Sequence, residues 1–152
     1  MELPIYQVDA FTADVFSGNP AAVCPLSQWL DKMTMQLIAR ENNLSETAFF
    51  APEGDHYRIR WFTPVEEVDL CGHATLASAF ILFSELEPKR EKVLFESRSG
   101  PLRVERTGAL LSLDFPSQRP VVCEAPEDLL AGLGGSPSAT MSVTSAAPSM
   151  SA

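Results

Sequence analysis

The residues best suited to chemistry lie between Thr63 and Thr75, where a histidine stands at the expected start of a helix. This stretch reads as the end of a strand, an acidic turn and then the small-residue sequence Gly72-His73-Ala74-Thr75. The first N–H groups of a helix have no partners inside the helix, and they lie at the positive end of its dipole. Such a start therefore favours a carboxylate or another anion. Gly72 allows a ligand to approach closely, and His73 can donate, accept or transfer a proton near neutral pH.

Two further tracts accompany this one. They are Phe16-Ser17-Gly18-Asn19-Pro20-Ala21-Ala22-Val23 and Asn43-Leu44-Ser45-Glu46-Thr47-Ala48-Phe49-Phe50. In this order and with these gaps, the three tracts resemble the PhzF-like family, which includes the phenazine biosynthesis-like domain proteins. The resemblance runs from Leu3 to Phe115 and corresponds to the first of the family's two lobes. It implies an α+β, diaminopimelate-epimerase-like fold, in which a mixed, curved sheet or barrel wraps around a central helix.

The resemblance also implies a cofactor-free reaction that moves a proton between two carbons of a small unsaturated carboxylic acid. Glu46 is then the general acid/base, because a weakly acidic C–H proton requires a base held within hydrogen-bond reach in an apolar pocket. His73 lies beside it and assists proton transfer or holds the substrate. Further substrate contacts are expected from the cleft rim and from the helix start, namely from Asn19, Gly72, Ala74 and Thr75.

Each of these residues also has an ordinary structural explanation. Glu46 reads as a solvated glutamate at the start of a strand, His73 as a core or capping histidine, and Asn19 as a turn residue. Cys71 lies near the position of a catalytic cysteine in related epimerases of the same fold, but we expect it to be a small buried apolar residue. Its spacing from His73 matches no usual zinc pattern, so we expect no metal there. That no other cofactor is needed is what the family resemblance implies.

The composition limits the class of protein. The chain has 152 residues, a net charge of −9 and 45% hydrophobic residues, which fits one domain with a sizeable core. Its three cysteines are odd in number and far apart, which argues against a disulfide framework. No basic patch with interleaved aromatic residues is present, so nucleic acid and anionic membranes are not expected as partners. With no apparent secretory signal or membrane span, the expected location is cytoplasmic.

The first part of the chain predicts two strands and a helix. A strand is expected from Leu3 to Phe11, followed by a turn and a short strand from Ala21 to Cys24. Ser27 is the expected cap of a helix that runs to Glu41. The apolar stripe of this helix is formed by residues at helical spacing, namely Leu30, Met33, Leu37 and Ile38.

A second helix is expected from Gly72 to Leu86, stopped by Pro88. It is apolar on all sides, with one face formed by Leu76, Ala79, Phe80 and Phe83, and such a helix must be enclosed by other elements. The enclosing strands are expected at residues 47–51, 57–62, 93–97, 102–106 and 110–115. Tight turns are expected at Ser99-Gly100 and Thr107-Gly108.

We therefore expect residues 1–118 to form the PhzF-like lobe and residues 119–133 to form a short connector or helical segment. Residues 134–152 are Gly, Ser, Ala, Pro and Thr with isolated apolar residues, which predicts a disordered low-complexity tail.

Two functions are compatible with this organisation. The first is an isomerase that acts on a small-molecule carboxylate. The second lobe of the family supplies further groups from a segment resembling Asp-Pro-x-Thr-Gly-Ser-Ala. This sequence lacks that segment, so the half-length chain is expected to have weak or no activity. The alternative is a non-catalytic binding protein, which uses the exposed inter-lobe surface to form a homo-oligomer or to bind a protein partner.

Overall fold

The computed structural model describes residues 2–14, 16–117, 119–124, 126–134 and 141–142. The chain divides by its internal contacts into a larger unit, residues 1–115, and a smaller unit, residues 116–152. The larger unit has an α+β fold that contains all the candidate site residues. Among the described residues, no helix is long and apolar enough to cross a membrane.

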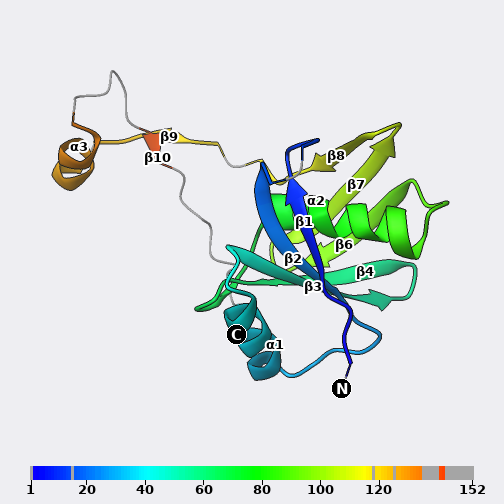
Figure 1. The fold of residues 1–152 in the computed structure, drawn as a ribbon. Coiled ribbons are helices and arrows are strands. Elements are labelled where there is room, and N and C mark those ends of the chain that lie inside the picture. Colours follow the sequence, from blue (N-terminus) through cyan, green and yellow to red (C-terminus); the bar gives the residue numbers. More distant parts are fainter. Residues whose placement is uncertain (1, 15, 118, 125, 135–140, 143–152) are drawn as a thin grey trace, which may run out of the picture. The chain divides into compact units, whose positions relative to one another are not determined.

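A mixed, curved sheet of eight strands forms the framework of the larger unit (Figure 1). Its order is β1-β2-β3-β4-β6-β7-β8, and the short β5 pairs with β4. The pairs β2–β3 and β4–β6 are parallel, and the other neighbours are antiparallel. The strand bounds are Tyr6–Ala10 (β1), Asn19–Pro25 (β2), Glu46–Glu53 (β3), His56–Phe62 (β4), Glu67–Val68 (β5), Lys92–Ser97 (β6), Gly100–Thr107 (β7) and Leu110–Asp114 (β8).

Each parallel pair is joined through a helix, because parallel neighbours require a crossover connection. Helix α1 (Lys32–Asn42) connects β2 to β3, and α2 (Gly72–Ile81) lies between β5 and β6. The two helices pack on different hydrophobic clusters: α2 lies within the curve of the sheet, and α1 packs on the other face.

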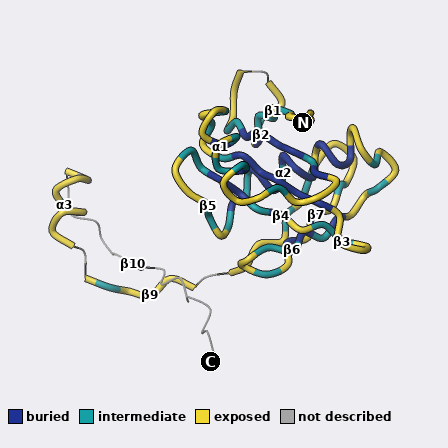
Figure 2. Tube along the Cα trace, turned by 90° about the horizontal axis from the view of Figure 1, so that it is seen from below, coloured by how far each residue is buried: buried dark blue, intermediate teal, exposed yellow. Residues whose placement is uncertain are grey.

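Helix α2 is the centre of the main core. Its Ala74, Ala77 and Ala79 are at most 1% exposed, and they pack against strand residues that include Trp61 and Phe95. Figure 2 shows the same concentration of burial along α2 and the strands around it. Small side chains allow the surrounding strands to approach the helix closely. The predicted curved sheet around a central helix is therefore confirmed.

Two details of this helix differ from the prediction. Phe80, placed on the predicted apolar face, is 50% exposed, so the sheet does not enclose the helix on every side. The final turn, η1 (Leu82–Leu86), is π-helical, and the N–H of Glu87 donates to the carbonyl of Leu82. The helical segment still ends at Leu86, before Pro88, as predicted.

The prediction for α1 was wrong about its start and about half of its apolar stripe: Leu30 and Ile38 pack against the outer-face cluster as predicted, and Met33 and Leu37 do not. Asp31 caps the helix, and its carboxylate accepts hydrogen bonds from the backbone N–H of Thr34 at 2.9 Å and from the Thr34 hydroxyl at 2.6 Å. Ser27 lies before the helix and does not cap it. Met33 and Leu37 are 67% and 54% exposed, whereas the buried residues are Met35 and Ala39. These pack against the outer-face cluster of Cys24, Leu26, Phe49, Ala51 and Phe62.

The remaining boundaries follow from backbone conformation and pairing. Strand β1 ends before Phe11, whose φ of 65° is left-handed and interrupts the predicted strand. Strand β2 begins earlier than predicted, because Asn19 pairs with Ala10. The predicted glycine turns are present, with φ of 97° at Gly100 and 61° at Gly108.

The smaller unit contains a short helix, α3 (Glu127–Leu133), and a two-stranded antiparallel pair, β9 (Val121–Val122) with β10 (Met141–Ser142). The predicted disordered tail, residues 134–152, lies outside the described residues except for residues 134 and 141–142.

Candidate functional site

The structure brings Glu46 and His73 together. The carboxylate Oε2 of Glu46 lies 3.3 Å from Nε2 of His73, and the two side chains are 21% and 10% exposed. Both atoms are shielded from solvent, and neither has a hydrogen bond of good geometry to another group within the described part of the chain. Buried polar atoms normally have partners, so this close pair is an exception that calls for a functional explanation.

The pairing follows from where two elements begin. Glu46 is the first residue of β3, whose parallel pairing sets it beside Ala21 of β2. Helix α1 ends just before it, at Asn43, which adopts the left-handed conformation. His73 is the second residue of α2, and α2 packs against β1, β2 and β3. The start of the central helix therefore meets the start of β3.

Cys71 lies on the other side of the imidazole. Its Sγ is 3.4 Å from Nδ1 of His73, so the ring lies between the thiol and the carboxylate of Glu46. Cys71 is the N-cap of α2 and has extended backbone dihedrals, which direct its side chain differently from a residue inside the helix. As predicted, it is buried, with 7% exposure.

Burial raises the pKa of the Cys71 thiol to about 11, and the nearby carboxylate of Glu46 acts in the same direction. The backbone N–H groups of Ala74 and His73 oppose this rise in pKa, although they do not reach the geometry of a capping hydrogen bond. The thiol is therefore protonated near neutral pH, and it can act as a weak donor beside the imidazole.

The predicted substrate contacts are placed as follows. Asn19 lies next to the site, because its Oδ1 is 3.5 Å from the hydroxyl of Ser45, the residue before Glu46. Gly72 faces the ring of Phe115, where an added Cβ would lie 3.4 Å from the nearest ring carbon. Ala74 is fully buried. Thr75 uses both of its donors within the first turn, since its N–H and its hydroxyl both bond the carbonyl of Cys71.

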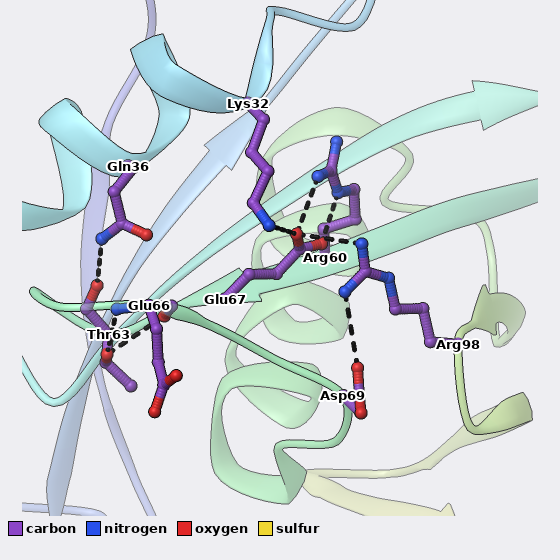
Figure 3. Close-up of polar contacts among 8 residues, drawn as sticks. All are labelled: Lys32, Gln36, Arg60, Thr63, Glu66, Glu67, Asp69 and Arg98. Carbon is purple, nitrogen blue, oxygen red and sulfur yellow. Dashed lines mark hydrogen bonds and ion pairs between the residues drawn. The ribbon is translucent and has the colours of Figure 1, made fainter. Parts of the chain in front are cut away.

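A charged cluster immediately before Cys71 was not foreseen from the sequence. The carboxylate of Glu67 in β5 is 2% exposed, and it contacts Arg60 of β4 through two hydrogen bonds of 2.7 and 2.9 Å. Lys32 of α1 lies 3.2 Å from the same carboxylate, and Arg98 lies 3.0 Å from it (Figure 3). Arg98 also contacts the carboxylate of Asp69, two residues after Glu67, as Figure 3 shows. The distance between the two groups is 3.5 Å.

This cluster holds in place the chain segment that leads to Cys71 and His73. Burial alone would raise the pKa of Glu67, but hydrogen bonds from Arg60 and Lys32 and the charges of Arg60 and Arg98 outweigh it, so the pKa is lowered. The carboxylate is held ionised and ties β5 to α1, β4 and the β6–β7 turn. The segment that leads from β5 to Cys71 is thereby anchored to three other parts of the larger unit.

A pocket of about 320 Å³ lies beside the cluster, lined by Trp29, Arg58, Ile59, Arg60 and Arg98. It is separate from the Glu46–His73 pair. Arg60 stacks over the ring of Trp29 at 5.6 Å. Arg60 and Arg98 are already bonded to carboxylates, so these guanidinium groups have a structural role in the cluster.

Comparisons with known proteins show which family the chain belongs to. Residues 8–148 match the PhzC-PhzF family, described as phenazine biosynthesis-like protein. The chain is 56% identical over 134 residues to an uncharacterized isomerase of Pseudomonas aeruginosa. This alignment covers 88% of this chain and 52% of that protein. It is 48% identical over 124 residues to the phenazine biosynthesis-like domain-containing protein of Homo sapiens, covering 76% and 43% of the two chains.

Solved structures agree with this match. A PhzF family protein of Enterococcus faecalis aligns with a TM-score of 0.82 and 50% identity, over 91% of this chain and 54% of that one. A PhzC/PhzF protein of Clostridium difficile aligns with a TM-score of 0.81 and 41% identity, over 93% of this chain and 54% of that one. The chain spans about half the length of the curated relatives it matches.

Proposed function

Because the chain belongs to the PhzC-PhzF, phenazine biosynthesis-like family, we propose that it carries the acid–base residues of an isomerase. The reaction class is a proton shift between two carbons of a small unsaturated carboxylic acid. Relatives at 51–56% identity are named uncharacterized isomerases, which supports an isomerase but identifies neither the proton shift nor a substrate.

The observation that carries this proposal is the shielded contact between Glu46 and His73 at 3.3 Å. A carboxylate that takes a proton from one carbon must hold it and return it to another, so it must be kept away from bulk water. Glu46 is the group we assign to this transfer. His73 is assigned to hold the transferred proton or the substrate through Nε2, the nitrogen that faces Glu46.

Substrate binding is assigned to the groups around the pair. The backbone N–H of Gly72, at the start of α2, is suited to a substrate carboxylate. Asn19 contributes an amide at the edge of the site. Ala74 contributes its backbone only, and Thr75, whose donors are both used within the helix, contributes by holding the first turn.

We propose that these 152 residues by themselves have weak or no activity, because they span about half the length of the relatives they match. Groups that close a site and exclude water supply much of the rate acceleration in enzymes, so an open site loses orders of magnitude in rate.

Deuterium incorporation tests the proposal. The chain is incubated at high concentration in D2O with a panel of small unsaturated carboxylic acids, and labelling at carbon is followed by mass spectrometry. We expect slow labelling by the wild type, none by Glu46→Gln, and wild-type labelling by Glu41→Gln, which changes an exposed glutamate on α1. Labelling by Glu46→Gln at the wild-type rate would refute the role of Glu46.

A second candidate function is binding without catalysis, through association with itself or another protein. It is favoured by three large apolar side chains on the surface of the larger unit: Phe11, Phe16 and Val65 are 72%, 99% and 84% exposed. Light scattering across a concentration series distinguishes this candidate. A monomer at high concentration argues against self-association, and absence of deuterium labelling by the wild type argues against catalysis by this chain.

A further inference from the structure

We propose that Cys71 is a positioning residue, which fixes the tautomer of His73 by donating its thiol hydrogen to Nδ1. Histidine has two ring nitrogens, and the group that contacts one of them decides what the other can do. In this site the two nitrogens have different neighbours, a thiol and a carboxylate. The inference deepens the proposed function and rests on it for its catalytic consequence, whereas the tautomer itself is measurable without turnover.

The thiol of Cys71 has one hydrogen to donate, and Nδ1 of His73 lies within hydrogen-bond distance of the sulfur, at 3.4 Å. The backbone groups of His73 and Ala74 that face the same sulfur are N–H donors, so they cannot accept this hydrogen. Burial raises the pKa of the thiol to about 11, so the hydrogen is present near neutral pH. The contact at Nδ1 is therefore an S–H group facing a ring nitrogen.

The carboxylate of Glu46 favours the same tautomer of His73. An ionised carboxylate can only accept hydrogen bonds, and Oε2 lies 3.3 Å from Nε2. With the hydrogen on Nε2, a donor faces an acceptor at both ends of the ring. With the hydrogen on Nδ1 instead, two lone pairs would face each other at Nε2, in a place shielded from solvent. A doubly protonated ring would leave the thiol hydrogen of Cys71 without its acceptor.

The ring is thus held at one nitrogen and presents the other. Nδ1 is engaged with Cys71, whereas Nε2 and Oε2 of Glu46 lack hydrogen bonds of good geometry within the described part of the chain. Buried polar atoms normally have partners, and hydrogen bonds in catalytic sites often tighten only when the substrate is bound. The Nε2–H group of His73 is therefore available to a substrate atom beside Glu46.

This tautomer gives the two side chains separate roles. An Nε2 that already carries a hydrogen cannot accept a second one, so Glu46 takes the proton and His73 holds the substrate. The C–H bond breaks, an O–H bond forms on Glu46, and the electron pair moves into the unsaturated system of the substrate. The Nε2–H group donates to the substrate atom that carries the resulting charge, and Glu46 returns the proton to the second carbon.

Nuclear magnetic resonance measures the tautomer directly. Long-range ¹H–¹⁵N correlation spectra of the full 152-residue chain at pH 7.5 distinguish a ring with hydrogen on Nδ1, on Nε2 or on both nitrogens. We expect His73 to carry its hydrogen on Nε2, with an Nδ1 signal displaced by an accepted hydrogen bond. His56 is the other histidine of the chain and serves as the internal reference.

Variants of Cys71 separate hydrogen bonding from packing. Cys71→Ser keeps a donor and should keep the displaced Nδ1 signal, whereas Cys71→Ala removes the donor and should lose the displacement. Cys24→Ala changes a buried thiol in the outer-face cluster and should leave the His73 signals unchanged. Glu46→Gln removes the bias from the carboxylate, because an amide can donate or accept. In that background, Cys71→Ala should lower the ratio of Nε2–H to Nδ1–H by roughly 2–5-fold, the effect of a weak hydrogen bond.

The proposal is overturned if the wild-type ring carries its hydrogen on Nδ1 or is doubly protonated. It is also overturned if Cys71→Ala keeps the wild-type Nδ1 signal, or if Cys71→Ser loses it, which would leave Cys71 as a packing residue of the main core. Circular dichroism checks that each variant is folded, and the wild type and Cys71→Ser decide the matter if Cys71→Ala is not. Absence of deuterium labelling by the wild type would refute the proposed function without altering the tautomer, so the two failures are distinct.

Discussion

Replacement of Glu67 by Gln should destabilise the larger unit more than its small change in shape suggests. The carboxylate of Glu67 is 2% exposed and is shared by Arg60, Lys32 and Arg98. Arg60, 21% exposed, is the best buried of the cations and binds both carboxylate oxygens, whereas Lys32 and Arg98 are at least 50% exposed. The paired hydrogen bonds with Arg60 therefore carry most of the effect.

The magnitude follows from this arrangement. Hydrogen bonds to charged groups contribute about 1.5–3 kcal/mol each, whereas exposed ion pairs contribute about 0–1 kcal/mol. An amide retains one acceptor for Arg60 but leaves its charge only partly compensated. We expect a loss of about 3 kcal/mol in the free energy of unfolding, at the low end of the range for breaking a buried pair. For a unit of this size, that corresponds to a fall in Tm of roughly 10 °C.

Urea denaturation followed by circular dichroism measures this difference. The matched control is Glu66→Gln, the same chemical change at the exposed neighbouring residue, and it should alter stability by less than about 0.5 kcal/mol. The two variants should have the wild-type m-value, so that the change in midpoint reports stability. A loss below about 1 kcal/mol for Glu67→Gln, or equal losses for both variants, would refute the reasoning.

The pH dependence of the same effect has a defined sign. The pKa of Glu67 is lowered from its usual value of 4.5 in the folded state, so the unfolded chain takes up a proton at higher pH than the folded chain does. The stabilisation by Glu67 is thus fully present above the unfolded pKa and is lost as the pH falls through the folded pKa. The difference between wild type and Glu67→Gln should be constant at neutral pH and shrink below about pH 4.5.

Two further predictions concern the core and the thiols. Phe50→Ala should cost about 3–5 kcal/mol in unfolding free energy, because the ring is 1% exposed, whereas Phe80→Ala, 50% exposed, should cost about 1 kcal/mol or less in the same denaturation experiment. Among the three cysteines, a thiol reagent at pH 7.5 should label Cys123 first, as located by peptide mass spectrometry. Burial raises the pKa of Cys24 to about 12 and that of Cys71 to about 11, so both should react only after unfolding; rapid labelling of either in the folded chain would contradict this.

The parts of the fold that the sequence predicted well are those with a local signal. Strand β4 alternates between core and surface side chains, and Gly100 and Gly108 lie where the chain requires positive φ. The small-residue helix after Gly72 packs within the curve of the sheet as predicted, except at Phe80, because a helix without a polar face has no stable position at a surface. These features depend on residues that are neighbours in the sequence, so their pattern is readable there.

The errors in α1 have a tertiary cause. Ser27 and Asp31 are both suitable N-cap residues, and the sequence does not distinguish between them. Of the predicted stripe of Leu30, Met33, Leu37 and Ile38, the first and last residues pack on the sheet, and Met33 and Leu37 do not. Packing against Phe49 and Phe62 on the outer face of the sheet instead selects Met35 and Ala39 as the buried residues. The side of a helix that is buried is thus decided partly by the surface it meets.

The candidate site shows the same division between local and distant information. His73 and Cys71 were recognisable as neighbours at a helix start, but residues two apart in a helix do not face each other. They meet here because Cys71 is the cap, with φ of −148° and ψ of 112°, and lies outside the helical conformation. Their contact with Glu46 required the parallel pairing of β2 with β3, which no local pattern specifies.

The cluster around Glu67 explains why a short segment can hold this geometry. Strand β5 has two residues and pairs only with the end of β4, so backbone hydrogen bonds alone anchor it weakly. Glu67 adds attachments to α1, β4 and the β6–β7 turn, and Asp69 adds a second contact to Arg98. The chain then reaches Cys71 with little freedom, which limits the positions open to the first turn of α2. The contacts of 3.3 and 3.4 Å at His73 require such support if Glu46 has the proposed catalytic role, because a catalytic group displaced by about 1 Å can lose roughly 100-fold in rate.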